Sequence, residues 1–324
     1  MTGHGTATML ERPQRRHVLD LDDFSREEIE QVFRAAEMMK EVLTRAIKQV
    51  PVLRGKTVVN LFWEASTRTR VSFELAAKSL SANVVSMTAA GSSVSKGESL
   101  LDTVRTLQAL GADFIVIRHS ESGAPYLVAQ HFRGSVLNAG DGRHAHPSQA
   151  LLDLFTIRER LGTIEGRKVV IIGDILHSRV ARSNLWGLQT MGAHVVLCAP
   201  PTLLGAEAWW KQTWPGIEIS YDLDEAVKGA DVLMALRLQR ERMQAGLLPS
   251  LREYSRHFAL TAERVARARP EALVMHPGPM NEGIEIMPDV VTSPQSAIEE
   301  QVTNGVAIRM ALLYLLAGGS QISL

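Results

Sequence analysis

The sequence contains a single cysteine, Cys198, among its 324 residues. One cysteine cannot form a disulfide bond within the chain, which excludes the class of small disulfide-stabilised proteins and favours a reducing compartment, here the cytoplasm. Cys198 lies within the apolar segment 194–199. We therefore expect its thiol to be buried and unreactive.

An excess of charge of one sign and a long apolar run are also missing. Acidic and basic residues number 35 each, and no block of like charge occurs, so nothing indicates a nucleic acid or a membrane surface as a partner. No apolar run reaches the roughly 20 residues that a membrane-spanning helix needs. Residues 1–16 are polar and lack the apolar core of a secretory signal, so we expect a disordered lead-in.

What is present is a regular alternation of strand-like and helix-like segments. Apolar residues make up 45% of the chain, enough for two domains with cores of their own. Strands are expected near 57–63, 83–87, 113–118 and 135–138, and again near 168–174, 194–199, 217–221, 231–236 and 273–276. Such alternation predicts an α/β fold of two Rossmann-like domains, each a parallel sheet covered by helices, joined by helices. We place the first domain at 1–147 plus 293–324, and the second at 148–292.

Several helix ends carry local signals. Ser25 and Glu28 have the spacing of a capping box, with Phe24 and Ile29 as a hydrophobic staple, and a helix from Pro147 to Leu161 should end at Gly162. Further helices are expected near 180–191, 205–213, 223–229 and 261–268. Three helices have a predicted apolar face. That of the first helix consists of Ile29, Val32, Phe33, Ala36, Met39, Leu43 and Ile47, and that of the helix 71–80 consists of Val71, Leu75 and Leu80. The last helix (293–317) has Ile298, Val302, Val306, Met310, Leu313 and Leu316.

The segment 64–70 (EASTRTR) joins a predicted strand to a predicted helix and is the strongest candidate site. Arg68 and Arg70 would lie in the first helical turn, where free N–H groups and the positive end of the helix dipole disfavour a cation. A bound anion reverses that sign, and Ser66, Thr67 and Thr69 add uncharged donors. The segment therefore predicts a phosphate-binding turn that needs no glycine-rich loop.

Other polar residues follow predicted strands, where ligands bind in open parallel sheets. Arg118 and His119 end one strand, and His146 precedes Pro147 at the start of a helix. Taken alone, His146 would be interpreted as a helix N-cap or a satisfied core histidine rather than as a ligand. The pair His144 and His146 could suggest a metal, but no acidic or cysteine group completes a ligand set, so no metal is expected.

The second half of the chain lacks the Gly-x-Gly-x-x-Gly fingerprint of dinucleotide-binding proteins, since the strand at 168–174 ends in GDILHS. This argues against a nicotinamide-dependent dehydrogenase. Arg179 follows that turn, and Arg237 and Gln239 follow the strand at 231–236. Arginine binds a carboxylate through two parallel hydrogen bonds, so this edge is suited to a carboxylate ligand. The loop 90–98, with Lys96, reads by itself as a solvated surface loop.

Taken together, these segments resemble the transcarbamoylase family over nearly the whole chain, from about Arg16 to the last helix. The motifs that carry the resemblance are FWEASTRTR (62–70), SKGE (95–98), IRH (117–119), HPSQALLD (146–153), Gly173-Asp174 with Arg179, RLQ (237–239) and HPGP (276–279). The SKGE loop and the HPGP segment point to the branch of the family that uses aspartate rather than ornithine. An ornithine or related transcarbamoylase is the alternative, and an inactive scaffold subunit is disfavoured by the retained charged residues.

The resemblance implies roles for single residues. Carbamoyl phosphate would be bound by the first domain and L-aspartate by the second, without a cofactor, and Arg68, Thr69, Arg118 and His146 would carry the catalysis. The residues implied for carbamoyl phosphate are Ser66, Thr67, Arg68 and Thr69 at the phosphate, Thr69, Arg118 and His146 at the carbonyl oxygen, and Gln149, Pro277 and Gly278 at the amide end. Those implied for aspartate are Lys96, Arg179, Arg237 and Gln239.

The resemblance also implies an assembly. The SKGE loop of the family reaches into a neighbouring subunit, so Ser93 and Lys96 would serve an adjacent site in a homotrimer with shared active sites. Glu64 would bridge to Arg179 and Arg242 when the domains close. The sequence leaves open whether a regulatory or dihydroorotase chain attaches to the trimer.

Overall fold

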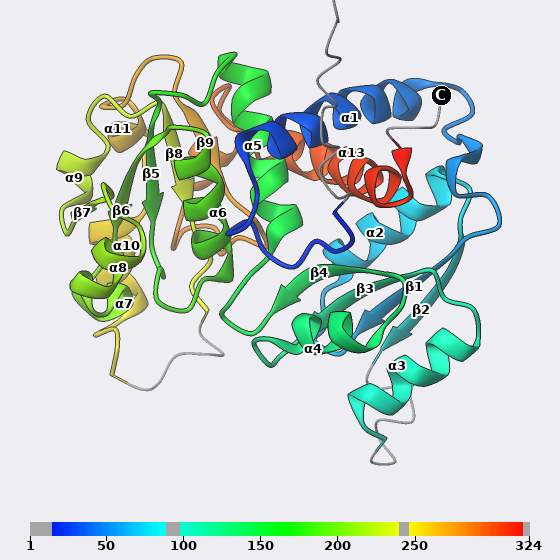
Figure 1. Ribbon diagram of the computed structural model, residues 1–324. Coiled ribbons are helices and arrows are strands. Elements are labelled where there is room, and N and C mark those ends of the chain that lie inside the picture. The colour runs from blue at the N-terminus through cyan, green and yellow to red at the C-terminus, as the bar shows by residue number, and fades with distance from the viewer. Residues whose placement is uncertain (1–14, 89–97, 240–245, 320–324) are drawn as a thin grey trace, which may run out of the picture.

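A computed structural model describes residues 15–88, 98–239 and 246–319, and within them the chain forms two parallel sheets (Figure 1). The first sheet has the order β2-β1-β3-β4 and the second the order β7-β6-β5-β8-β9. The strands of the first are β1 (Thr57–Phe62), β2 (Asn83–Thr88), β3 (Phe114–His119) and β4 (Ser135–Asp141). Those of the second are β5 (Lys168–Ile172), β6 (His194–Cys198), β7 (Glu218–Ser220), β8 (Val232–Ala235) and β9 (Leu273–Met275). The predicted α/β fold with two Rossmann-like units is confirmed.

Each sheet has one point at which the strand order reverses. In the first sheet β1 pairs with β2 on one side and β3 on the other, with Leu61 opposite Ile117. In the second, β5 pairs with β6 and with β8 in the same way. The carboxyl ends of β1 and β3, and of β5 and β8, are therefore the places where a ligand would bind.

Helices cover both faces of each sheet. In the first unit α1 (Arg26–Thr44), α2 (Thr67–Ser79) and α13 (Ile298–Leu316) pack together, while α3 (Leu100–Ala109) and α4 (Ala124–His131) share the apolar cluster of the opposite face. In the second unit α5 (Pro147–Leu161) and α6 (Arg179–Thr190) pack against each other. The remaining helices are the short 3₁₀ turn Pro51–Leu53, α7 (Pro201–Leu204), α8 (Glu207–Thr213), α9 (Leu223–Ala226), α10 (Leu251–Phe258), α11 (Ala262–Val265) and α12 (Pro288–Val291).

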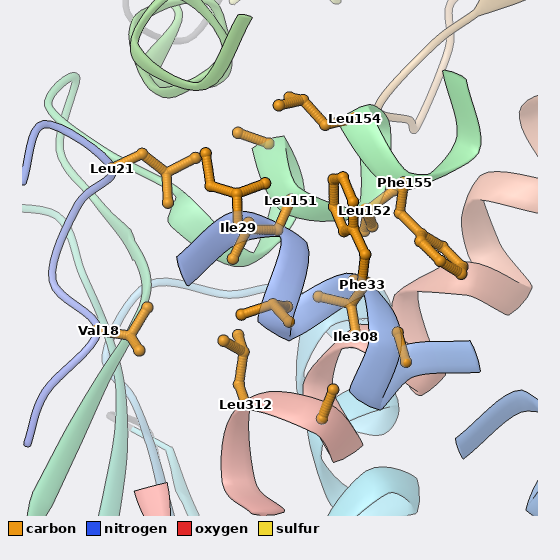
Figure 2. Close-up of a cluster of buried hydrophobic side chains, with 14 of the residues drawn as sticks. Val18, Leu21, Ile29, Phe33, Leu151, Leu152, Leu154, Phe155, Ile308 and Leu312 are labelled. Carbon is orange, nitrogen blue, oxygen red and sulfur yellow. The ribbon is translucent and has the colours of Figure 1, made fainter. Parts of the chain in front are cut away.

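One apolar core runs from the first sheet into the second and is centred on α1, α5 and α13 (Figure 2). Phe33 of α1 meets Phe155 of α5 with ring centroids 5.6 Å apart, and Ile308 of α13 packs in the same cluster. Because α5 and α13 touch elements of both units, burial of these side chains holds the two sheets in a defined relation.

The local signals at helix ends are confirmed. Ser25 and Glu28 form a complete capping box, and Gly162 ends α5 with a positive φ of 77°. Cys198 is buried, and burial raises the pKa of its thiol to about 12. Among the described residues no helix is both long and apolar enough to cross a bilayer.

Three predicted apolar faces are partly wrong. Val71 and Leu75 are exposed, because α2 buries the face formed by Phe73, Ala76 and Ala77. Ile47 lies beyond the end of α1 and is exposed. Val302 is also exposed.

The exposure of Val302 follows from the way α13 packs, and this helix also begins later than predicted. It starts at Ile298 rather than near Ser293, and its buried face includes the polar side chains of Gln301, Asn304 and Arg309. A stripe drawn through apolar residues alone therefore gives a wrong rotation. In the second unit α9 and α11 are single turns where longer helices were expected, and α7, α10 and α12 were not predicted.

Candidate active site

The first turn of α2 follows closely after β1 and differs from the starts of the other described helices that have a serine as N-cap residue. Ser66 is its N-cap residue, but the Ser66 side chain accepts no hydrogen bond from the helix. By contrast, the side chains of Ser25, Ser99, Ser178 and Ser250 all cap the helices that they precede. The Ser66 hydroxyl and the N–H groups of this turn are thus arranged to receive an external anion.

The loop after β9 reaches this turn from the second unit. Gly278 has a φ of +60°, and a Cβ atom added there would overlap the guanidinium group of Arg68. Its N–H donates to Nδ1 of His276 (2.8 Å). Pro277 has no N–H, so these two residues can offer a ligand only their carbonyl oxygens, which are hydrogen-bond acceptors.

Arg118 at the end of β3 and Arg179 at the start of α6 meet at Glu64. Arg179 donates to both Glu64 carboxylate oxygens at 2.8 Å, and Arg118 donates to Oε1 at 3.1 Å. A Cβ atom added to Gly140, whose φ is +116°, would lie 3.0 Å from Arg179 and 3.1 Å from Arg118. The glycine therefore allows the two cations to approach the end of β4 closely.

Backbone contacts hold this arginine cluster in place. The carbonyl oxygen of Arg118 accepts from the N–H of Trp63 (2.8 Å), and Arg179 also donates to the carbonyl oxygen of Gly142 (3.1 Å). The side chains of Arg118 and Arg179 are only 11% and 7% exposed, and both of these nearly buried charges face the Glu64 carboxylate. Glu64 thus links strand ends of the two units.

His146 precedes α5 and is buried beside these cations. Its backbone N–H donates to Oγ of Ser183 (2.9 Å), which in turn donates to Asp20 (2.8 Å). Burial lowers the pKa of the His146 imidazole well below its usual value of 6.5, and the charges of Arg118 and Arg179 lower it further. The ring is therefore neutral, and its buried Nδ1 has no hydrogen-bond partner in the described part of the chain.

A neutral imidazole beside two guanidinium groups is suited to stabilise a developing negative charge. It can donate one hydrogen bond but is a weak base, because burial and the charges of Arg118, Arg179 and Arg309 all disfavour its protonated form. His144 behaves differently, since Asp141 lies 3.2 Å from its Nδ1 and raises its pKa. Within the described ranges no group of three or more histidine, cysteine or acidic residues is arranged to hold a metal.

The second sheet presents its own polar edge. Asp174, after β5, accepts from Nδ1 of His177 (2.8 Å) and from the backbone N–H of Gln239 (3.2 Å). This contact ties the segment after β8, which carries Arg237 and Gln239, to the end of β5. Both residues are half-buried there. They lie at the reversal point of this sheet, and their role as carboxylate ligands stays a prediction.

Three residues named from the sequence, Ser93, Lys96 and Arg242, lie outside the described residues. Glu64, for which Arg179 and Arg242 were the expected partners, does pair with Arg179. Its pairing with Arg118 was not expected.

Sequence reasoning missed the groups that support the site. Asp153 lies one helical turn after Gln149 and is fully buried. Arg309 of α13 donates to Ser72 of α2 (2.8 Å), and burial lowers the pKa of its guanidinium to about 10. Glu285 accepts hydrogen bonds from Leu238, His276 and Asn281. For Asp153 and Arg309 the available signal was a charged residue within an apolar helical pattern, whereas Glu285 lies in a turn and carried no such signal.

Fold and site together define a two-domain α/β enzyme with polar and charged side chains gathered at the strand ends of two parallel sheets. Residues 16–159 match the carbamoyl-phosphate-binding domain of the aspartate/ornithine carbamoyltransferases, and residues 165–316 match the Asp/Orn-binding domain. The chain belongs to the aspartate/ornithine carbamoyltransferase family. The resemblance stated from the sequence is thereby confirmed.

Individual relatives narrow the comparison. The chain is 76% identical to an aspartate carbamoyltransferase catalytic subunit of Roseiflexus sp. (strain RS-1), over 95% of this chain and 96% of the relative. It is 70% identical to that of Chloroflexus aurantiacus, over 94% and 99%.

Solved structures show the same architecture. Ornithine carbamoyltransferase from Pyrococcus furiosus matches with a TM-score of 0.84 and 32% identity, over 94% of this chain and 97% of that one. Aspartate transcarbamoylase from Trypanosoma cruzi, in complex with carbamoyl phosphate and aspartate, matches with a TM-score of 0.83 and 31% identity, over 93% and 96%.

Proposed function

We propose that the chain transfers the carbamoyl group of carbamoyl phosphate to the amino group of L-aspartate, which gives N-carbamoyl-L-aspartate and phosphate. The observation that carries the proposal is the neutral, buried His146 beside Arg118 and Arg179 at the meeting point of the two sheets. The relatives that are 70–76% identical bear the name aspartate carbamoyltransferase, which supports aspartate rather than ornithine as the acceptor.

The phosphate would be bound at the first turn of α2 by Ser66, Thr67, Arg68 and Thr69. The uncapped Ser66 hydroxyl supports this assignment, as does Arg68, whose guanidinium lies against the loop after β9. The carbonyl oxygen of the substrate would face Thr69, Arg118 and His146. Gln149 and the carbonyl groups of Pro277 and Gly278 would accept from the carbamoyl amino group.

Aspartate would be bound by Arg179, Arg237 and Gln239. Its neutral amino group attacks the carbamoyl carbon, the C–O bond to phosphate breaks, and the departing phosphate accepts the proton that nitrogen loses. The leaving group is already activated, so the proposal requires no cofactor. The protein contributes positioning and stabilisation of the oxyanion, for which removal of one donor typically costs about 10²–10³ in kcat.

The assay that tests this proposal measures phosphate release from carbamoyl phosphate by the purified chain with L-aspartate, with L-ornithine or with neither. We expect release only with L-aspartate. Turnover with L-ornithine alone would favour the alternative transcarbamoylase, and no turnover with either amine would reject the transferase assignment.

We further propose a homotrimer in which Ser93 and Lys96 complete the site of a neighbouring subunit, with Arg242 joining Glu64 on domain closure. Trimers mixed from Lys96→Ala and His146→Ala chains should regain activity, because some sites then combine two intact contributions. Verified hybrids without recovery would contradict shared sites. Whether a regulatory or dihydroorotase chain binds the trimer is a separate matter for co-purification.

The domain division at 1–147 plus 293–324 and 148–292 also remains a proposal. The packing of α13 against α1 and α2 supports counting the last helix with the first domain, although the Asp/Orn-binding match runs to residue 316. We also propose a place in pyrimidine biosynthesis and a cytoplasmic location, which the single cysteine supports.

A further inference from the structure

Asp153 lies at the centre of a buried network of amides that connects three helices. Its Oδ1 accepts from Gln149 of the same helix (2.9 Å) and from Gln301 of α13 (2.8 Å), and its Oδ2 accepts from Asn184 of α6 (2.9 Å). The residue is fully buried, and burial raises the pKa of its carboxyl group to about 6, while the three amide hydrogen bonds and the charge of Arg309 favour the ionised form. At pH 7 the carboxyl group is therefore mainly ionised. Nothing in the reaction proposed above uses this carboxylate directly.

An ionised carboxylate can only accept hydrogen bonds, so each amide must turn its nitrogen toward Asp153 and its oxygen away. For Gln149 this orientation directs the Oε1 atom away from Asp153, and no described protein group donates to that oxygen. Gln149 is the side chain assigned above to the amide end of carbamoyl phosphate. Its carbonyl oxygen is therefore the atom available to the substrate.

The same carboxylate also acts on the loop after β9. Because Gln301 points its nitrogen at Asp153, its oxygen faces the other way and accepts from the backbone N–H of His276 (3.0 Å). His276 in turn accepts from the N–H of Gly278, which leaves Pro277 and Gly278 with carbonyl oxygens only. Two separate parts of the site thus offer acceptors alone.

We propose that Asp153 is a positioning residue that makes the amide end of the site a set of hydrogen-bond acceptors, and that this set selects a carbamoyl NH₂ group over an acyl group without N–H donors. The inference rests on the proposed function. A ligand such as acetyl phosphate, which carries a methyl group in place of NH₂, leaves the oriented acceptors unpaired, whereas carbamoyl phosphate satisfies them.

The test compares the dissociation constants of carbamoyl phosphate, acetyl phosphate and inorganic phosphate for full-length wild type and Asp153→Ala. We expect wild type to prefer carbamoyl phosphate to acetyl phosphate, and this preference to fall about tenfold or more in the variant. Phosphate affinity should change much less, by about twofold, since the hydrogen bonds of Asp153 itself go to Gln149, Asn184 and Gln301 and not to the first turn of α2. Alanine is used rather than asparagine, because the amide of an asparagine at 153 could donate to the Asn184 Oδ1 atom and so keep part of the network. That oxygen is buried and has no hydrogen-bond partner among the described residues.

Asp231→Ala is the matched control. Asp231 is also a buried carboxylate, and it accepts hydrogen bonds from Arg167 (2.9 Å) and from the N–H of Lys168 (2.9 Å). It precedes β8 and so lies at the amino end of that strand, whereas the candidate site lies at the carboxyl ends. Its loss should lower stability and leave the preference unchanged. A general loss of packing would instead weaken the binding of all three ligands in both Asp153→Ala and Asp231→Ala.

The outcomes separate the inference from the function on which it rests. An unchanged preference in Asp153→Ala with intact phosphate binding overturns the role of Asp153 alone. A wild type that does not prefer carbamoyl phosphate overturns the proposed function as well. If Asp153→Ala does not fold, Gln301→Met decides, because it breaks the link between Asp153 and the loop after β9 and leaves the hydrogen bond between Gln149 and Asp153 in place. We expect a partial fall in the preference, and a preference equal to wild type would reject the inference.

Discussion

Replacing Glu64 with glutamine measures how strongly one carboxylate couples the two units. Glu64 accepts three charge-assisted hydrogen bonds, two from Arg179 at 2.8 Å and one from Arg118 at 3.1 Å. Its side chain is 22% exposed, and those of Arg179 and Arg118 are 7% and 11% exposed. Glutamine keeps the shape and one acceptor oxygen but removes the negative charge that faces both guanidinium groups.

The magnitude follows from burial. Removing one partner of a fully buried ion pair costs about 3–5 kcal/mol, and exposed pairs contribute about 0.2–1 kcal/mol. For this largely buried cluster we expect a loss of about 2–3 kcal/mol in the free energy of unfolding. Most of it should appear as coupling between Glu64 and Arg179 in a double-mutant cycle with Arg179→Met.

The assay is urea denaturation of the full chain at low salt and at about 1 M salt, where the screening length falls to about 3 Å. Glu165→Gln is the control, because Glu165 pairs with Arg26 at 2.7 Å but the two side chains are 66% and 49% exposed. The control should lose less than about 1 kcal/mol, and salt should abolish that effect. Coupling at Glu64 below about 1 kcal/mol, or as salt-sensitive as the control, would refute the reasoning.

Two further predictions concern single groups. Ser25→Ala should cost about 1 kcal/mol of stability, because the capping box of α1 is lost. Ser66→Ala should leave the thermal midpoint in calorimetry unchanged and should weaken phosphate binding in a titration, because the Ser66 side chain does not cap α2. A large loss of stability in Ser66→Ala would contradict the site. Burial holds the pKa of His146 well below 6.5, so at low pH the unfolded chain binds a proton that the folded chain excludes. The free energy of unfolding should therefore fall as the pH drops below 6.5, by up to about 1.4 kcal/mol per pH unit. His146→Gln should remove that part of the slope, and equal slopes for both proteins between pH 6.5 and pH 5 would contradict a buried neutral ring.

The sequence-based expectations succeeded where the signal is local. The capping box at Ser25 and Glu28 involves residues three apart, and the end of α5 at Gly162 depends on one residue with a positive φ. The strand-end residues Arg118 and Arg179 could be named because parallel strands bring their carboxyl ends to one edge whatever the details of packing. Their roles as ligands came from the family resemblance and remain to be tested.

The expectations failed where a distant part of the chain decides which face is buried. Val71 and Leu75 have apolar side chains at helical spacing, yet α2 buries Phe73 instead, and Arg309 lies over the Phe73 ring, 5.0 Å from its centroid. Val302 is exposed because Gln301 turns inward to Asp153, a residue 148 positions earlier in the chain. Periodicity counts apolar residues and does not register a buried polar side chain whose partner is far away in sequence.

The amino-acid sequence by itself determined the positions of the strands, the two-sheet fold and the polar residues at the ends of β1, β3, β5 and β8, because these depend on short-range patterns and on the geometry common to parallel sheets. Only the tertiary structure decided that Glu64 joins Arg118 to Arg179, that His146 is neutral, and that Asp153 orients the amides around it. Each of these depends on charges and donors that come within hydrogen-bond distance only after the two sheets have packed around α5 and α13, where exclusion of water gives such contacts their strength.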